Sequence, residues 1–304
     1  METPAPTRSR WIRTTKWFVV IGSMVLVGIY LGVSLLSAEL LTRSHNQRPP
    51  LEPTFVSELA TPWSVRTEDG LTLRGWYHPT DERRHLVILV HGMWSSWAEM
   101  AGLGRDLHRR GYDVLLFDLR GHGESDPSRL FMGRRERGDL RAVLAWAKGQ
   151  KFTPDRIGWV GYSMGGSTLL MEAAQNPNIR VAVIDSPYGN LPELLDAQLT
   201  RYSNLPRFFN PGILTAAHLA FGVRTDDLSP IRSARSWGRR PLLLIHGEAD
   251  TIVPAQQARM LARALGSTCQ TVMVPGVEHV EAYRMNPEHY VSRVDRFLQK
   301  NLTP

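Results

Sequence analysis

The sequence predicts a protein of the α/β class, in which helices cover both faces of a mostly parallel sheet. Short apolar runs alternate with helical patterns from residue 86 to the C-terminus, which is the first observation behind this prediction. The second is a Gly-x-Ser-x-Gly pentapeptide, residues 161–165, that joins one of these runs to a helical pattern. The 304-residue length and the composition, 42% apolar and 21% charged, allow one large domain or two small ones.

Six apolar runs are predicted to be strands of this sheet. They cover residues 86–90, 114–117, 157–160, 181–184, 242–245 and 271–274. The helical patterns that accompany them cover about residues 96–110, 136–149, 164–175, 254–265 and 287–300. Strands that read as near-continuous apolar runs are typical of parallel sheets that are buried on both faces.

An antiparallel hairpin is predicted ahead of these strands, at one edge of the sheet. Residues 63–67 and 71–77 alternate apolar and polar side chains around Glu68-Asp69-Gly70, and Asp-Gly is a typical hairpin turn. The alternation of strands and helices lapses between Ser186 and Arg240. We interpret residues 187–240 as a small helical cap inserted into a domain that covers residues 63–304.

The N-terminal region contains twenty consecutive residues without a charge, Trp17 to Leu36. At ~1.5 Å per residue they span ~30 Å, the thickness of a bilayer core. The basic flank, residues 1–16, precedes them, so we predict a single-pass membrane anchor over residues 17–38 with its N-terminus in the cytoplasm and the domain of residues 63–304 outside it. A cleaved signal peptide is the alternative. We favour the anchor because the apolar run is long and Leu36-x-Ala38 is a poor cleavage site.

The net charge of +7 is concentrated near the N-terminus, where residues 1–50 hold six Arg or Lys and two Glu. We therefore expect no nucleic-acid partner, since no basic stripe is present. Residues 39–62 are polar and proline-rich and are predicted to be a linker. The single cysteine, Cys269, excludes an internal disulfide.

A nucleophilic serine is predicted at Ser163, in the turn between the run 157–160 and the helix 164–175. This context makes the pentapeptide informative, because such a turn holds the serine in a strained backbone above the sheet. Gly161, Gly165 and Gly166 supply the room that the turn needs. An ordinary turn with a buried serine is the alternative.

A serine hydroxyl needs a base within hydrogen-bond reach, and the base needs an acid that fixes its tautomer. His279 follows the last predicted strand, and Asp250 follows the strand before it. The order Ser163, Asp250, His279 is the order expected of an α/β hydrolase. Each residue follows a different strand, so all three can converge at the carboxyl ends of the sheet.

Other histidines and acids also lie near the ends of predicted strands or on predicted helices. We interpret His91, His122 and His246 as structural, and His289 as exposed on the last helix. Among the acids, Asp250 is favoured over Asp185 and Glu248, and we expect Asp118 to fix the Arg120–His122 turn.

The oxyanion of a tetrahedral intermediate needs two backbone N–H donors. We expect them from Met164, after the nucleophile, and from Met93, in the loop after the first central strand. Trp94 and Trp97 border that loop. They are candidate substrate-binding residues that wall an acyl pocket, and core aromatics are the equal alternative.

The sequence resembles the α/β-hydrolase superfamily over about residues 63–300. The resemblance is to membrane-anchored Bem-type and ABHD-type hydrolases, related to acylglycerol lipases and serine aminopeptidase-like hydrolases. The stretches that carry it are LVILVHGMWSS, VLLFDLRGHGES, IGWVGYSMGG, IDSPYGN, PLLLIHGEADTIVP and VPGVEHVEAYRMNPEHYVSRVDRFL.

The resemblance implies the triad Ser163, Asp250 and His279, an oxyanion hole from Met93 and Met164, no metal and no cofactor. We expect a membrane-anchored serine hydrolase that cleaves a small-molecule acyl ester or lipid-like substrate. A peptidase of the aminopeptidase type is the alternative, and Glu193 and Asp196 in the cap are candidates to bind a substrate N-terminus. The second alternative is a non-catalytic, membrane-tethered interaction domain.

Overall fold

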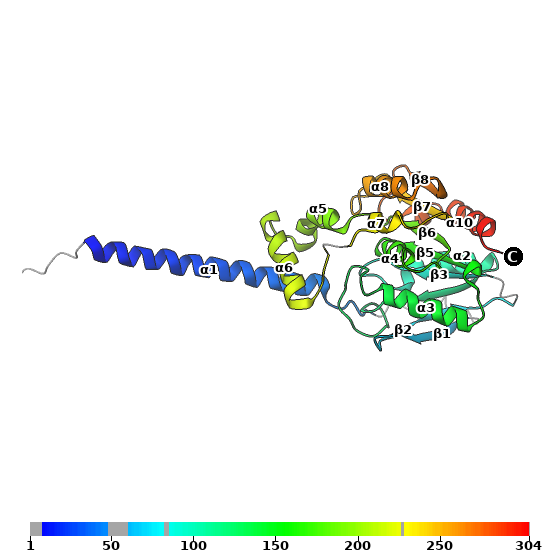
Figure 1. Ribbon diagram of the computed structural model, residues 1–304, viewed down its shortest axis with the longest axis horizontal. Coiled ribbons are helices and arrows are strands. Elements are labelled where there is room, and N and C mark those ends of the chain that lie inside the picture. The colour runs from blue at the N-terminus through cyan, green and yellow to red at the C-terminus, as the bar shows by residue number, and fades with distance from the viewer. Residues whose placement is uncertain (1–7, 48–59, 82–84, 226–227, 304) are drawn as a thin grey trace, which may run out of the picture. The chain divides into compact units, whose positions relative to one another are not determined.

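The protein contains an eight-stranded sheet in the order β1-β2-β4-β3-β5-β6-β7-β8 (Figure 1). The computed structural model describes residues 8–47, 60–81, 85–225 and 228–303. Strand β1 pairs with β2, and β2 with β4, in antiparallel fashion, and the other five pairings are parallel. The predicted α/β-hydrolase fold class, with a mostly parallel sheet and an antiparallel hairpin at its edge, is therefore confirmed.

The strands contain all six predicted apolar runs. Their bounds are β1 Thr61–Arg66, β2 Thr72–His78, β3 Leu86–Val90, β4 Asp113–Phe117, β5 Ile157–Tyr162, β6 Val181–Asp185, β7 Leu242–Gly247 and β8 Cys269–Val274. Every residue of β3 to β7 is buried, which explains their apolar sequences. The hairpin turns at Asp69-Gly70, where Gly70 has a φ of 89°.

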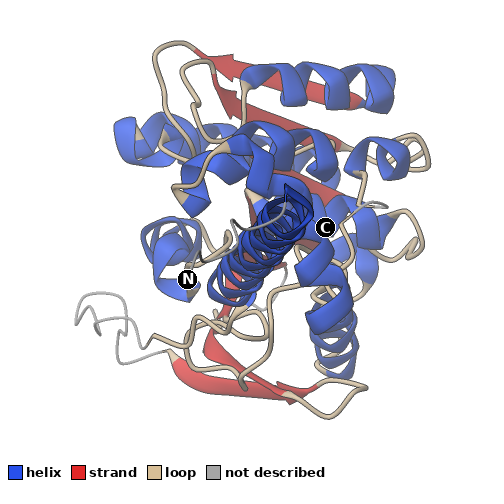
Figure 2. Cartoon of the chain, turned by 90° about the vertical axis from the view of Figure 1, so that its left-hand side faces the viewer, coloured by secondary structure: helices blue, strands red, loops and turns tan. Residues whose placement is uncertain are grey.

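Helices lie on both faces of the sheet (Figure 2). On one face α2 packs against α10, and on the other α4 contacts α3 and α7, which in turn contacts α8. The bounds of these and of one short helix before α10 are α2 Ala101–Arg109, α3 Arg137–Gly149, α4 Met164–Ala173, α7 Pro230–Ala234, α8 Ala255–Leu265, α9 Ala282–Met285 and α10 Pro287–Asn301. The predicted helix 96–110 begins as a 3₁₀ turn, Trp97–Met100, before α2.

A separate compact unit joins the N-terminal helix to part of the predicted cap. It comprises the residues up to Thr42 together with Leu199–Val223. It contains α1 (Arg8–Thr42), the end of α5 (Leu191–Ser203), a 3₁₀ turn at Arg207–Phe209 and α6 (Asn210–Phe221). The described part of the region 187–240 thus contains several helices. Its position over the strand ends stays a prediction.

Helix α1 continues beyond the predicted anchor. It ends at Thr42, and its segment Thr15–Thr42 is long and apolar enough to cross a membrane, with a mean hydropathy of 2.4 over its best window. Part of the predicted linker is therefore helical, and β1 already begins at Thr61. Residues 48–59 of that linker lie outside the described residues.

Candidate active site

Ser163 is the single residue between β5 and α4. Its φ of 47° and ψ of −116° are strained for a residue with a side chain. The neighbouring glycines explain how this turn fits: a Cβ on Gly165 would lie 2.3 Å from the carbonyl oxygen of Val90, and one on Gly161 would lie 2.7 Å from the backbone nitrogen of Gly166. The sequence has glycines at this turn because backbone atoms approach each other too closely there to leave room for a Cβ.

His279 connects Ser163 to Asp250. Its Nε2 lies 2.9 Å from Oγ of Ser163, and its Nδ1 lies 2.7 Å from Oδ2 of Asp250. The histidine comes from the loop after β8 and the aspartate from the loop after β7, so the structure brings together the three residues selected from the sequence. The imidazole is largely enclosed, since 15% of its side chain is exposed.

The Asp250 carboxylate is fixed on both oxygens. Its Oδ1 accepts the backbone N–H groups of Ile252 and Val253, over 2.9 and 2.7 Å. Its Oδ2 also lies 3.3 Å from Nε2 of His246. Burial on its own would raise the pKa of Asp250, but the hydrogen bonds from His246, His279 and Val253 outweigh burial and hold the pKa well below its usual range. The carboxylate is therefore ionised beside His279 throughout the neutral range.

The rival acid, Asp185, is engaged elsewhere. It accepts hydrogen bonds from the hydroxyls of Ser186, over 2.9 Å, and Tyr290, over 3.0 Å. Burial raises the pKa of Asp185 to about 6. Its backbone carbonyl accepts the N–H of Ser163 over 2.8 Å. Asp185 therefore supports the backbone of Ser163, and Asp250 is the carboxylate that contacts His279.

Asp118 and His91 are structural, as the sequence suggested. Asp118 accepts the backbone N–H groups of Trp97 and Glu124, over 2.7 and 2.8 Å. Nε2 of His91 accepts the backbone N–H of Leu119 over 3.0 Å. Burial lowers the pKa of His91 well below its usual value, so the ring is a neutral acceptor.

The loop after β3 carries the predicted oxyanion donors. Among the hydrogen bonds of the described residues, none uses the backbone N–H of Met93 or of Met164. The next residue, Trp94, has a φ of 58°, and its N–H donates to Nε2 of His122 over 3.2 Å. Nδ1 of His122 then carries the proton and donates to the carbonyl of Arg120, over 2.9 Å. Burial lowers the pKa of His122 to about 4, which keeps Nε2 free to accept.

The turn that contains His122 is held by a short segment that directly follows α1. We call this segment, Ser44–Asn46, the strap. The N–H of His45 donates to the carbonyl of Gly121 over 2.6 Å. The amide nitrogen of Asn46 donates to the carbonyls of His122, Gly123 and Ser125, over 3.2, 3.1 and 2.6 Å. The strap thus holds the turn whose histidine accepts the Trp94 N–H in the loop after β3.

The two tryptophans beside this loop differ in their surroundings. Trp97 is 2% exposed and packs edge-on against Trp76 in the hydrophobic core, which favours the core-aromatic alternative. Trp94 is only half-buried. Its contact with substrate stays a prediction.

Glu99 is a site residue that the sequence did not single out. Its Oε2 accepts the backbone N–H of Gly92 over 2.8 Å. A Cβ on Gly92 would lie 3.4 Å from that oxygen and 3.4 Å from Cβ of Ser163, so the carboxylate lies close to the nucleophile. No motif or spacing rule marks this glutamate, which lies within the predicted helix 96–110.

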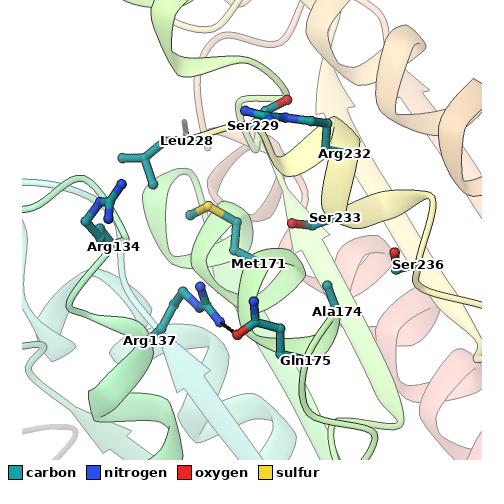
Figure 3. A pocket seen from close by; sticks show the side chains of 10 residues that line it. All are labelled: Arg134, Arg137, Met171, Ala174, Gln175, Leu228, Ser229, Arg232, Ser233 and Ser236. Carbon is teal, nitrogen blue, oxygen red and sulfur yellow. Dashed lines mark hydrogen bonds between the residues drawn. The ribbon is translucent and has the colours of Figure 1, made fainter. Parts of the chain in front are cut away.

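A pocket of about 450 Å³ lies apart from these residues, beside α4 (Figure 3). Figure 3 shows Arg134 and Arg137 on one side of it and Arg232 on the other. Arg137 also pairs with the buried Glu172, 3.1 Å away. Neither Ser163 nor its partners line this pocket. Among the described residues, no group of three or more His, Cys, Asp or Glu side chains could hold a metal ion.

Two family profiles match the chain. The one described as alpha/beta hydrolase fold matches residues 85–222, and the one described as TAP-like protein matches residues 219–304. An uncharacterized protein of Mycobacterium tuberculosis (strain H37Rv) is 30% identical over 240 residues, 77% of each chain. The esterase YjfP of Escherichia coli K12 is 28% identical over 240 residues, 70% of this chain and 88% of that protein.

Solved structures share the fold. The Pyrococcus furiosus esterase Pf2001 is 26% identical, with a TM-score of 0.70 over 86% of this chain and 99% of that one. The esterase RhEst1 from Rhodococcus sp. ECU1013 is 20% identical, with a TM-score of 0.58 over 79% of this chain and 99% of that one, and it supports the fold alone.

Proposed function

The chain belongs to the α/β-hydrolase superfamily and is a hydrolase, and from this premise we propose that it cleaves carboxylic esters with Ser163 as the nucleophile. The observation that carries the proposal is the 2.9 Å contact between Oγ of Ser163 and Nε2 of His279. The esterases among the similar proteins support the choice of an ester as substrate.

The reaction follows from the geometry of Ser163, His279 and Asp250. Nε2 of His279 takes the hydroxyl proton as Oγ attacks the substrate carbonyl, and Asp250 stabilises the resulting imidazolium. The N–H groups of Met93 and Met164 donate to the oxyanion of the tetrahedral intermediate. His279 then protonates the leaving alcohol, which leaves an acyl-enzyme. A water molecule that His279 deprotonates attacks this ester and releases the acid.

The same proposal includes a membrane anchor. Helix α1 is long and apolar enough to span a bilayer, and the basic residues that precede its apolar run favour a cytoplasmic N-terminus. The catalytic domain then lies outside the cytoplasm, next to the membrane surface. A lipid-like or acylated ester is the substrate class that suits this location.

The test is to label the full-length protein in detergent with a fluorophosphonate probe and to measure hydrolysis of a p-nitrophenyl ester. We expect Ser163→Ala to abolish labelling and to lower kcat by on the order of 10³-fold or more. Ser236→Ala, a serine of the separate pocket, is the matched control and retains both activities. Activity that survives in Ser163→Ala would overturn the proposal. Wild-type protein that is folded but inert would favour an interaction domain.

An amide substrate with a free amino group is the second candidate function. It is favoured by Glu99, whose carboxylate lies close to Ser163 and could bind an ammonium group. Comparing a p-nitrophenyl ester with an aminoacyl-p-nitroanilide separates the two. A peptidase would hydrolyse the anilide, and Glu99→Gln would raise its KM while leaving that for the neutral ester unchanged.

A further inference from the structure

Helix α6 has an unusually apolar composition for an exposed helix. Residues 208–221 contain no Asp, Glu, Lys or Arg, and His218 is their only ionisable side chain. The helix is twelve residues long, or ~18 Å, which is too short to cross a bilayer. A short apolar helix of this kind is either buried in protein or in contact with lipid.

Helix α6 packs against α1. The ring of Phe209 stacks on the ring of Tyr30, with centroids 5.1 Å apart, and the Tyr30 hydroxyl donates to the carbonyl of Phe208 over 3.1 Å. Gly212 allows the two backbones to approach, since a Cβ there would lie 2.4 Å from Oγ of Ser34. Figure 1 shows α6 crossing α1 and not running parallel to it.

The outer surface of this helix pair is apolar and exposed. Phe208 is 63% exposed and Leu219 is 78% exposed. A groove of about 410 Å³ runs between the two helices and is lined by Leu31, Leu35 and Leu219 together with Tyr30, Pro211 and small residues. Leu31 and Leu35 are themselves 58% and 45% exposed. The apolar surface of α6 is therefore continuous with the apolar surface that α1 presents along its predicted membrane span.

The contact with Tyr30 sets how deep in the membrane this apolar surface of α6 would lie. Tyr30 lies six residues before Leu36, the end of the uncharged run. At ~1.5 Å per residue this is ~9 Å inside the apolar span. A helix that crosses a membrane-spanning helix at this level lies along the leaflet on the side of the catalytic domain.

We propose that α6, together with Phe208, is an interfacial helix whose exposed apolar side chains contact lipid acyl chains in that leaflet. This inference rests on the proposal that α1 spans the membrane. Lipid is the occupant because the surface continues the lipid-facing side of α1 without an intervening charge. Burying Phe208 and Leu219 in lipid removes two large apolar side chains from water, which favours association with the bilayer.

The test places an environment-sensitive fluorophore on the surface. Cys269 is the only cysteine, so Cys269→Ser provides a background without a thiol. Leu219→Cys in this background is labelled with a nitrobenzoxadiazole maleimide, and the full chain is inserted into phosphatidylcholine vesicles. We expect the label to be quenched by doxyl-labelled lipids in the membrane and to be protected from aqueous iodide.

Two matched positions complete the experiment. Met285→Cys labels a residue of α9 that is 68% exposed and apolar but belongs to the main body, and iodide should quench it. Val25→Cys labels the middle of the predicted span and reports whether α1 is embedded at all.

Iodide quenching at residue 219 equal to that at residue 285, with residue 25 in lipid, overturns the interfacial helix alone. Protection of residue 219 from both quenchers indicates a protein partner or a second copy and also overturns it. If iodide quenches the label at residue 25, α1 does not span the membrane, and the premise of the inference fails. None of these readings uses hydrolysis, so they are independent of the proposed catalytic role of Ser163.

Discussion

The backbone N–H of Trp94 donates to Nε2 of His122 over 3.2 Å, and this bond joins the loop after β3 to the neighbouring turn. The bond requires a neutral imidazole, and burial supplies it by lowering the pKa of His122 to about 4. His122 is thus a positioning residue. It does not touch the reacting atoms, but it holds the residue next to the proposed donor Met93.

Replacing His122 should affect turnover more than substrate binding. In His122→Phe the Trp94 N–H loses its acceptor, so the Met93 donor is less well placed for the oxyanion. We expect kcat to fall by about 10- to 100-fold with little change in KM, since one oxyanion donor is worth at least that much. His122→Gln restores an acceptor oxygen and should recover part of the loss. Equal kcat values for wild type and His122→Phe would contradict the role.

The same residue should make stability depend on pH. An unfolded histidine has a pKa of about 6.5, above the folded value of about 4, so the unfolded state holds more protons between these values. The contribution of His122 to stability is therefore complete above pH ~6.5 and is lost as the pH falls toward 4. Relative to His122→Phe, wild type should lose about 3 kcal/mol of unfolding free energy between pH ~7.5 and pH ~4. Urea unfolding of both proteins at several pH values measures this difference, and His289→Gln on the exposed side of α10 serves as the control.

Asp250→Asn should separate the effect of the carboxylate charge on His279 from the effect of the hydrogen bonds that Asp250 accepts from its own loop. The amide oxygen can still accept the N–H groups of Ile252 and Val253, so the thermal midpoint should change little. The carboxylate charge beside His279 is lost, and the imidazole can adopt the wrong tautomer. We expect kcat for a p-nitrophenyl ester to fall by on the order of 10³- to 10⁴-fold. A loss smaller than tenfold in a folded protein would point to another acid.

Gly165→Ala should disrupt the turn at Ser163. The added methyl group would lie 2.3 Å from the Val90 carbonyl, which is backbone and cannot move aside. We expect a loss of about 1–3 kcal/mol or more in unfolding free energy, together with the loss of fluorophosphonate labelling. Gly149→Ala is the matched control, because nothing lies within 4 Å of its Cβ and stability should stay the same or rise slightly. Normal labelling by Gly165→Ala would refute the close packing of this turn.

Asn46→Ala removes the side chain that donates to three carbonyls of the neighbouring turn. Its bonds to His122, Gly123 and Ser125 are partly accessible to water, so we expect a loss of about 1–2 kcal/mol in unfolding free energy. Because the turn supports the loop that holds the proposed donor Met93, kcat should fall several-fold as well. Gln47→Ala, at an exposed position in the same segment, should change neither quantity. Chemical unfolding measures the free energies of unfolding of the two variants, and steady-state kinetics measures their kcat values. Equal values for Asn46→Ala and Gln47→Ala would contradict the prediction.

The sheet could be predicted because its signals are local. Each of the six apolar runs lies on one strand, and those on β3 to β7 are buried. The residues that follow strand ends meet at one edge of a parallel sheet. This is why Ser163, Asp250 and His279 could be selected together although 116 residues separate the first from the last. His91 and Asp118 could be excluded for the same reason, since each sits in a turn that needs hydrogen bonds of its own.

The parts that could not be predicted depend on contacts without a sequence pattern. Asn46 meets His122 across 76 residues, and Tyr30 meets Phe208 across 178. No periodicity or spacing marks such pairs, so the sequence predicts neither the hydrogen bonds of the strap nor the packing of α6 on α1. The sequence does not show whether a single aromatic side chain points into the core or into a pocket. Trp97 could therefore be assigned to the core only from its burial.

The strap has a consequence for any form of the protein that is cut free of α1. It begins two residues after α1 ends at Thr42, and β1 does not start until Thr61. Cleavage just before Ser44 would release a domain that keeps its donors to the Gly121–Ser125 turn. Cleavage between Gln47 and Thr61 would release one without them. The point at which a protease cuts would therefore decide how stable the released domain is and how fast it turns over.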